Sequence, residues 1–298
     1  MDRAEKRMNG SASMNCPAGH KEVFDVDIQE VNRWGALLEE KLKLRSMPIA
    51  MKFCEKREDV PKEAIFPMEK YGKHMALCQT FSYTRMKGLT IAMGREDHWC
   101  WTPPVSFGCV DCEPGTPAFE EVCKYIGVPG IENARKFFAE FPKLPRGKYP
   151  YLVTSPLKNC TFVPDIVIVY AEAAKINHLC GTVKAVVGGT FTSVFDGIDS
   201  CIYCTIPSFQ KNEFRITFPD PGDRERARAG DDEMILTIPG GRLQEFMEVF
   251  EKRHQRGGFG DRLFEFNLDF PHPPFYNTLF EMWGLDNYGT TWDVPAGK

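Results

Sequence analysis

Cysteine side chains carry the clearest chemistry in this sequence. Five of the 11 cysteines lie between Cys78 and Cys123. Thiolates bind zinc and iron–sulfur clusters, and they also exchange disulfides. An odd number of cysteines does not suit a complete disulfide framework, and the N-terminal residues do not resemble a secretory signal. We therefore expect these thiols to be reduced and available for metal binding or redox chemistry.

Four of these cysteines predict a metal site. Cys109 and Cys112 form a CxxC pair, which supplies two ligands from one tight turn. Cys100 precedes the pair in the same segment, and Cys78 lies on a predicted helix one strand earlier. Together they predict a site for an iron–sulfur cluster, with zinc as the alternative and simple burial of the thiols as the competing interpretation. His98 could replace one ligand, although a packed histidine is the other interpretation.

A second CxxC pair consists of Cys201 and Cys204, our second choice as metal ligands. A thioredoxin-like role requires the first cysteine of such a pair to lie at a helix N-terminus, where the helix dipole stabilises the thiolate. Asp199 or Ser200 could cap a short helix at this position. Two thiols that face a core are the alternative.

Composition and motifs exclude several classes of protein. The net charge of -4 argues against a protein that binds nucleic-acid phosphates, which usually carries a basic face. No apolar run approaches the roughly 20 residues of a membrane-spanning helix. The sequence contains no GxxxxGK[ST], GxGxxG, HExxH or GxSxG motif. We expect a cytoplasmic protein that binds neither nucleic acid nor membranes.

Hydrophobic periodicity predicts helices that alternate with strands. Apolar residues at helical spacing from Asp27 to Leu42 predict a first helix, and Gly88 is expected to end a second one. The segment 95–115 has no regular period, so we expect a long functional loop. We expect the charged residues 219–232 to form a solvated loop between two strands. Further helices are expected at 117–126, 132–141 and 240–256. A strand followed by a helix is expected at 164–186, and a short helix or turn at 195–207. Further strands are expected at 46–53, 88–94, within 143–157, and at 188–195, 213–219 and 233–239.

This alternation predicts an α/β fold, with α+β as the alternative. We expect one large domain, residues 23–256, in which helices flank a mixed β-sheet. Residues 1–22 are polar and are expected to form a mobile leader. Residues 257–298 are rich in aromatic side chains, so we expect this tail to pack on its own domain or on a partner subunit, which makes a homodimer plausible.

Four segments in a fixed order resemble a known family: LKLRSMPIAMKF, LCQTFSYTRMKGLTIAMGREDHWCWTPPVSFG, PDIVIVYAEAAKINHLCGTV and GDDEMILTIPGGRLQEFMEVF. From Leu42 to Phe250, the chain resembles domain of unknown function 169, an uncharacterised prokaryotic family that is common in anaerobes and archaea. The family usually has cysteines at the positions of Cys78 and Cys100 and near that of Cys201, so the resemblance favours Cys78 and Cys100 over the other thiols as site residues. A further family cysteine before the GDR-like turn is missing here, where the chain reads RITFPDPGDR. Its candidate replacements are Cys109, Cys112 and Cys204.

The first functional hypothesis is a cytoplasmic iron–sulfur protein of anaerobic metabolism, either a redox protein or an enzyme such as an oxidoreductase or lyase. Its partner would be a small-molecule substrate or a redox protein. The second hypothesis is a structural zinc protein or a small-molecule binding module without catalysis. The third is a thiol–disulfide redox protein that uses Cys201 and Cys204.

Overall fold

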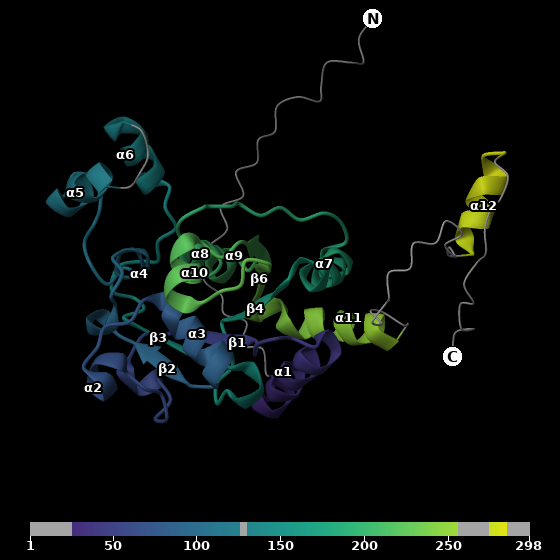
Figure 1. Ribbon diagram of the computed structural model, residues 1–298, viewed down its shortest axis with the longest axis horizontal. Helices are drawn as coiled ribbons and strands as arrows, with labels where there is room; N and C mark the ends of the chain where they lie inside the picture. The colour runs from purple at the N-terminus through teal and green to yellow at the C-terminus, as the bar shows by residue number, and fades with distance from the viewer. Residues whose placement is uncertain (1–25, 126–129, 256–273, 285–298) are drawn as a thin grey trace, which may run out of the picture. The chain divides into compact units, whose positions relative to one another are not determined.

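The computed structural model describes residues 26–125, 130–255 and 274–284 of the chain (Figure 1). The chain divides into two compact units, residues 1–258 and 259–298. The expected leader and most of the aromatic tail lie outside the described residues, so their predicted roles remain predictions. The described helix of the second unit is α12 (Phe275–Met282).

Six strands form one sheet in the order β2-β3-β1-β4-β6-β5. All neighbouring strands in it are antiparallel. The prediction of a single domain in which helices flank a sheet is confirmed. The prediction of a mixed sheet was wrong, because the sheet is antiparallel. The strands are β1 (Ile49–Cys54), β2 (Ile91–Met93), β3 (Tyr151–Pro156), β4 (Ile166–Glu172), β5 (Arg215–Thr217) and β6 (Glu233–Pro239).

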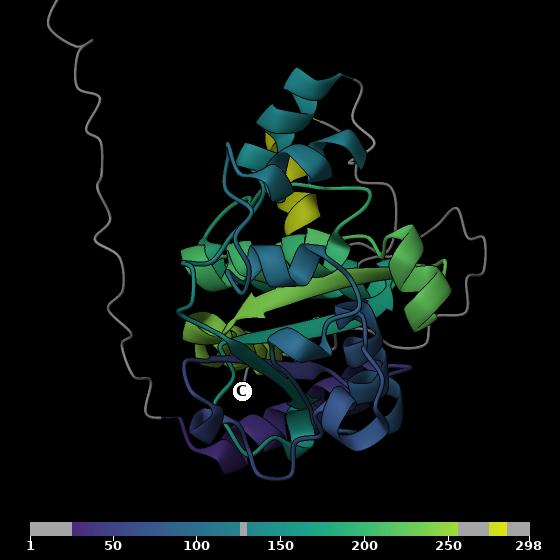
Figure 2. The same cartoon turned by 90° about the vertical axis from the view of Figure 1, so that its left-hand side faces the viewer.

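The sheet has a hydrophobic core on each face, and Figure 2 shows its strands between helices. In β4, Ile166, Ile168 and Tyr170 belong to one core, and Val167 and Val169 belong to the other. Successive side chains of a strand point to opposite faces, so a strand covered on both faces is apolar throughout.

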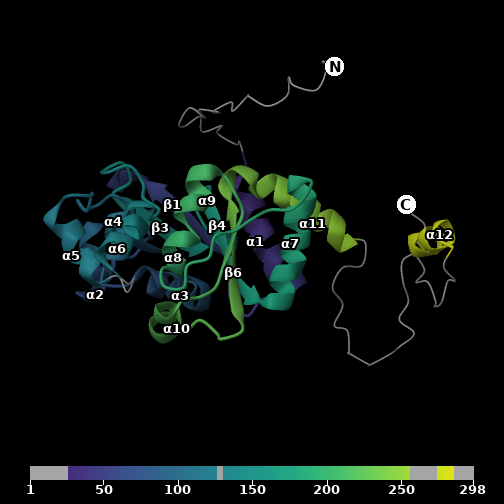
Figure 3. The ribbon, with the colours of Figure 1, turned by 90° about the horizontal axis from the view of Figure 1, so that it is seen from above.

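Three long helices cover one face, as Figure 3 shows. They are α1 (Ile28–Leu42), α7 (Ala173–Val187) and α11 (Leu243–Gln255). Shorter helices supply side chains to the core on the other face: α3 (Leu77–Lys87), α4 (Thr102–Ser106), α5 (Pro117–Tyr125), α6 (Ile131–Ala139), α8 (Ser200–Tyr203) and α9 (Ile206–Lys211). The cysteines of interest lie on this second side.

Local sequence determines several helix ends as expected. The Asp27 carboxylate accepts a hydrogen bond of 3.1 Å from the Gln29 backbone N–H and caps α1. Gly88 ends α3 with a φ of 73°, a left-handed conformation that glycine adopts readily. Both helices therefore begin or end where the sequence predicted.

Three predictions of local structure were wrong. The segment 188–195 is not a strand. The segment 95–115 is not irregular throughout, because it contains α4 and a 3₁₀ turn at Arg95–Asp97. The charged connection between β5 and β6 contains a further helix, α10 (Pro221–Ala227), because Asp220 caps it and Pro221 starts it. A short α2 (Pro67–Tyr71) was also not foreseen.

Within the part of the chain that the structure describes, none of the helices combines the length and the hydropathy that crossing a membrane requires.

A candidate site where thiols and carboxylates meet

Three cysteines that are distant in sequence lie near the starts of helices on one side of the sheet. Cys78 is the second residue of α3, Cys201 is the second residue of α8, and Cys100 lies two residues before α4. Figure 1 shows α3, α8 and α10 beside one another. Cys78 and Cys100 pack together with Ala76 and Ala227 in a small apolar cluster, and Cys201 interacts electrostatically with Cys78.

Polar contacts connect Cys100 to α8 and α10. The Thr102 hydroxyl lies 3.4 Å from the Cys100 Sγ atom, and the Thr102 side chain lowers the pKa of Asp199. Asp220 Oδ2 accepts hydrogen bonds from the backbone N–H and the hydroxyl of Ser200, at 2.9 and 3.0 Å. These contacts hold the start of α8 against the start of α10.

Further contacts connect α10 to α3 and to the sheet. The Cys78 thiol donates to the Gly222 carbonyl over 3.9 Å. Asp220 Oδ1 accepts from the Asp223 backbone N–H at 2.8 Å, and the Tyr170 hydroxyl donates to Asp223 Oδ2 at 2.9 Å. We call the following residues the thiol–carboxylate cluster: Cys78, Cys100, Cys201, Asp199, Asp220 and Asp223.

The carboxyl groups of the cluster are buried close to one another. Burial, followed by the charges of Asp196 and Asp220, raises the pKa of Asp199 to about 7. Burial is also the main reason that the pKa of Asp223 rises to about 7, and the Tyr170 hydrogen bond opposes this shift. Both carboxyl groups therefore resist ionisation near neutral pH, because little solvent and few cations stabilise their charge.

The buried thiols are protonated for the same reason. Burial, followed by the charge of Asp223, raises the pKa of Cys78 to about 12. Burial also raises the pKa of Cys201, and the charges of Cys78 and Asp220 add to the effect. A metal ion must displace such protons in order to bind.

The predicted CxxC pair at Cys109 and Cys112 lies in different surroundings. Cys112 is buried in the large core beside Cys123, and Cys109 packs against that core. Burial raises the pKa of Cys109 and of Cys112, and neither thiol shows an electrostatic interaction with Cys78. The structure thus divides the four predicted ligands into two pairs. Cys78 and Cys100 share a small cluster, whereas Cys109 and Cys112 lie at the large core, to which Cys201 also belongs.

Cys204 is fully buried behind Cys201. Its thiol donates to the Cys201 carbonyl at 3.6 Å, and burial raises its pKa well above that of an ordinary thiol. The pKa of Cys201 is also raised. A redox-active CxxC pair shows the opposite shift, because the thiolate is its nucleophile.

Among the side chains described, no three from histidine, cysteine, aspartate and glutamate are grouped closely enough to hold a metal ion. His98 lies against Phe107, with 6.2 Å between ring centroids. Burial lowers the pKa of His98 to about 4, so this histidine is neutral and packed.

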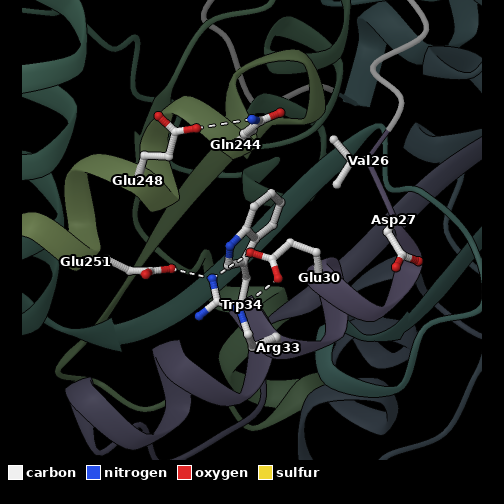
Figure 4. A pocket seen from close by; sticks show the side chains of 8 residues that line it. All are labelled: Val26, Asp27, Glu30, Arg33, Trp34, Gln244, Glu248 and Glu251. Atoms are coloured by element: carbon white, nitrogen blue, oxygen red, sulfur yellow. Dashed lines mark hydrogen bonds and ion pairs between the residues drawn. The ribbon is translucent and has the colours of Figure 1, made fainter.

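A hollow on the other side of the sheet, between α1 and α11, contains no thiol (Figure 4). Arg33 lies between Glu30 and Glu251 and forms an ion pair of 2.6 Å with each. Gln244 donates to Glu248 at 3.1 Å. The polar side chains of this hollow are thus largely paired with one another.

The carboxylates of the cluster were not predicted from the sequence. Asp220 and Asp223 stand in the run DPGD, where an aspartate before a proline and a second aspartate three residues later is typical of a helix start. That run was interpreted as part of a solvated charged loop. The DPGD run, taken as the start of a helix, would have predicted that Asp223 lies within α10 rather than in a loop.

The family model for domain of unknown function 169, described as uncharacterised ArCR, matches residues 37–249. The chain therefore belongs to this family, as the resemblance of its motifs suggested. The match includes every residue of the thiol–carboxylate cluster. No match was found among curated proteins or among solved structures.

Proposed function

We propose that this protein binds an iron–sulfur cluster at the thiol–carboxylate cluster and works as a redox protein or a metal-dependent enzyme. Cys78, Cys100 and Cys201 are the proposed ligands, because cysteine thiolates are the usual ligands of such clusters. The observation that carries the proposal is that Cys78 packs with Cys100 while the charge of Cys78 raises the pKa of Cys201, so that thiols from three separate segments lie near buried carboxylates. This assignment replaces Cys109 and Cys112 with Cys201.

The electrostatics of the site favour the binding of a cation. The pKa values of Asp199, Asp223 and Cys78 are all raised, chiefly by burial and in part by neighbouring acidic groups. Iron cations would stabilise the ionised forms of these groups and lower the pKa values. A buried acidic site of this kind therefore favours a metal over an anionic ligand.

A cluster is proposed in place of a single ion because a cluster spreads its cysteine ligands more widely. Thiolate ligands of one zinc ion all lie about 2.3 Å from the ion, so their sulfur atoms also lie close to one another. In a cluster, each cysteine binds a different iron or shares it with one neighbour, so the sulfurs stand farther apart. The described side chains are not grouped for a single ion. A cubane cluster takes four ligands, which leaves one position for Cys204, a carboxylate or a substrate.

The bound group would supply electron transfer or Lewis-acid activation of a substrate oxygen. The chain itself holds the ligands in place through Asp220, which fastens α8 to α10. The half-buried Cys100 is the least covered of the three thiols, so a substrate or redox partner would approach from its side. Action on a small molecule or a redox partner, in the cytoplasm and in anaerobic metabolism, completes the proposal.

The test is elemental analysis of protein purified without oxygen. We expect iron and inorganic sulfide together with visible absorption, and loss of both in Cys78→Ser, Cys100→Ser and Cys201→Ser. Cys109→Ser is the matched control and should keep the metal, because Cys109 does not belong to the small cluster in which Cys78 and Cys100 pack. Circular dichroism would establish that each variant is folded.

Other outcomes would select other functions. One equivalent of zinc, with unfolding after chelation, would identify a structural zinc protein. Loss of iron in Cys109→Ser and not in Cys201→Ser would move the site to the CxxC pair. A folded, colourless protein without iron would reject the proposal.

A further inference from the structure

Cys78 and Cys100 lie on two segments that backbone hydrogen bonds hold side by side. The Met75 N–H donates to the Asp97 carbonyl at 2.8 Å, and the Trp99 N–H donates to the Met75 carbonyl at 3.0 Å, which makes a parallel bridge. Bridged segments lie about 4.8 Å apart, within the Cα separation of about 4.4–6.8 Å that a disulfide spans. Cys78 stands three residues after Met75, and Cys100 directly follows Trp99. The bridge therefore brings the two cysteines into the same neighbourhood.

Side-chain packing continues this proximity to the thiols. Cys100 packs against a small buried cluster that consists of Ala76, Cys78 and Ala227. The other two members of this cluster are alanines, whose methyl groups do not react. Cys201 belongs to the large core instead. Cys78 is therefore the thiol that a reacting Cys100 meets first.

The two thiols differ in their access to solvent. Cys78 is 6% exposed, and its Sγ atom lies 3.9 Å from the Gly222 carbonyl. Cys100 is only half-buried, with its Sγ atom 3.4 Å from the Thr102 hydroxyl. An oxidant in solution reaches Cys100 first. Redox-sensing cysteines have this arrangement, in which an accessible thiol lies beside a second thiol that resolves its oxidised form.

We propose that Cys78 and Cys100 form a reversible disulfide when the protein meets hydrogen peroxide. The Cys100 sulfur attacks one peroxide oxygen and the O–O bond breaks. The departing hydroxide takes up the thiol proton and leaves as water, so Cys100 becomes a sulfenic acid. The Cys78 sulfur then attacks the Cys100 sulfur, the S–O bond breaks, and the hydroxide leaves with the Cys78 proton as a second water. The two thiols lose two electrons, and the peroxide gains them.

This inference does not depend on the proposed function, because it requires only the two thiols. Disulfides in a reducing compartment are usually transient and serve catalysis or redox sensing, and a thiol reductant reverses them by exchange. The link would join the start of α3 to the segment before α4. It would also withdraw both sulfurs from metal binding, since the thiolate is the form that binds a metal.

The experiment uses the full-length protein, reduced and freed of any metal with a chelator. Hydrogen peroxide is added, iodoacetamide blocks the remaining thiols, and tandem mass spectrometry maps the tryptic peptides without reduction. Trypsin places Cys78 on the peptide 74–85 and Cys100 on the peptide 96–124, where fragment ions distinguish it from the other cysteines. Cys180→Ser is the matched control, because Cys180 is a half-buried thiol of α7 that packs against the core on the other face.

We expect the two peptides of the wild type to be linked, with the loss of two hydrogen atoms, and to separate after dithiothreitol. The link should remain in Cys180→Ser. It should be absent from Cys78→Ser, where dimedone should trap the Cys100 sulfenic acid instead. A link from Cys100 to Cys109 or Cys201, or a sulfinic acid on Cys100 without any link, would overturn the proposal. The wild-type map decides this whether or not the variants fold. Failure of the reduced protein to bind iron would reject the proposed function and leave this disulfide expected.

Discussion

Arg85 of α3 and Glu233 of β6 form a buried, two-pronged ion pair in the core beside the thiol–carboxylate cluster. The Nη1–Oε1 and Nη2–Oε2 distances are 2.8 and 2.9 Å, and the side chains are 2% and 6% exposed. The Arg85 guanidinium also lies 4.1 Å from the centroid of the Tyr170 ring, and Tyr170 in turn donates to Asp223. The pair thus connects the helix that carries Cys78 to the tyrosine that holds Asp223.

Breaking this pair should destabilise the protein strongly. Glu233→Gln leaves the buried Arg85 charge without its carboxylate, and we expect the free energy of unfolding to fall by about 3–5 kcal/mol. Urea denaturation, followed by circular dichroism, measures the change.

Arg45→Met provides the control for this prediction. Arg45 pairs with Asp232 and with Glu172, and the three side chains are 49%, 60% and 29% exposed. Loss of an exposed pair should cost less than about 1 kcal/mol. Equal losses in Glu233→Gln and Arg45→Met would contradict the structural role of the buried pair.

The direction of the strands could not be predicted from their sequences. Residues 166–171 read IVIVYA, an apolar run that is typical of parallel strands buried on both faces. Here α7 and α11 cover one face while α3 and its neighbours cover the other, so an antiparallel sheet gives the same pattern. Helix positions were easier to predict because caps such as Asp27 and Gly88 act locally.

The site was predicted in part. Residue type and the family resemblance singled out Cys78 and Cys100, and the structure shows that these two pack together. The spacing of Cys109 and Cys112 suggested that they belong to the same group as Cys78 and Cys100, but spacing does not determine which side chains a loop packs against, and these two thiols lie outside the small cluster of Cys78 and Cys100. The contribution of Asp220 depends on contacts with Ser200, 20 residues away, and sequence pattern does not record such contacts.

The stability of the protein should depend on pH through His178. Burial, followed by the charges of His254 and Arg253, lowers the pKa of His178 to about 4. As the pH falls from about 6.5 to about 4, His178 binds a proton in the unfolded chain but not in the folded chain. The free energy of unfolding therefore decreases. Burial lowers the pKa of the neighbouring His254 as well, and its effect has the same sign.

His178→Leu should reduce this dependence, because leucine cannot be protonated and fits against Phe250, whose ring now lies 6.0 Å from that of His178. Urea denaturation at pH 7 and at pH 5 gives the measurement. We expect wild type to lose more stability than His178→Leu between these two pH values. The same loss in both proteins would rule out His178 as the titrating group.

Gly35 lies where α1 crosses the backbone that follows β3. A Cβ atom at this position would lie 2.4 Å from the Lys158 backbone nitrogen and 2.8 Å from the Leu157 carbonyl carbon. Gly35→Ala should therefore lower the free energy of unfolding by about 1–3 kcal/mol, although alanine is the better helix former. Gly189→Ala is the control, because nothing lies within 4 Å of its added Cβ atom. If both variants unfold at the same urea concentration, the prediction that a Cβ atom at Gly35 collides with the neighbouring backbone is wrong.

The cysteines of the site should differ in their reaction with iodoacetamide. Cys78, Cys201 and Cys204 are 6%, 8% and 0% exposed, and their pKa values are raised by burial. Cys100 is only half-buried. The thiolate is the form that reacts, so Cys100 should be alkylated first under native conditions.

Mass spectrometry of proteolytic peptides, sampled over time at pH 8, measures the order of modification. In denaturant the four thiols should react at similar rates, because burial no longer protects any of them. Anaerobic loading with iron and sulfide should slow the alkylation of Cys100 if this thiol is a ligand, since a coordinated sulfur is no longer free to attack. Alkylation of Cys201 or Cys204 before Cys100 would contradict the burial described here. It would also favour the thiol–disulfide function over the metal site, because a redox-active pair needs a reactive first cysteine.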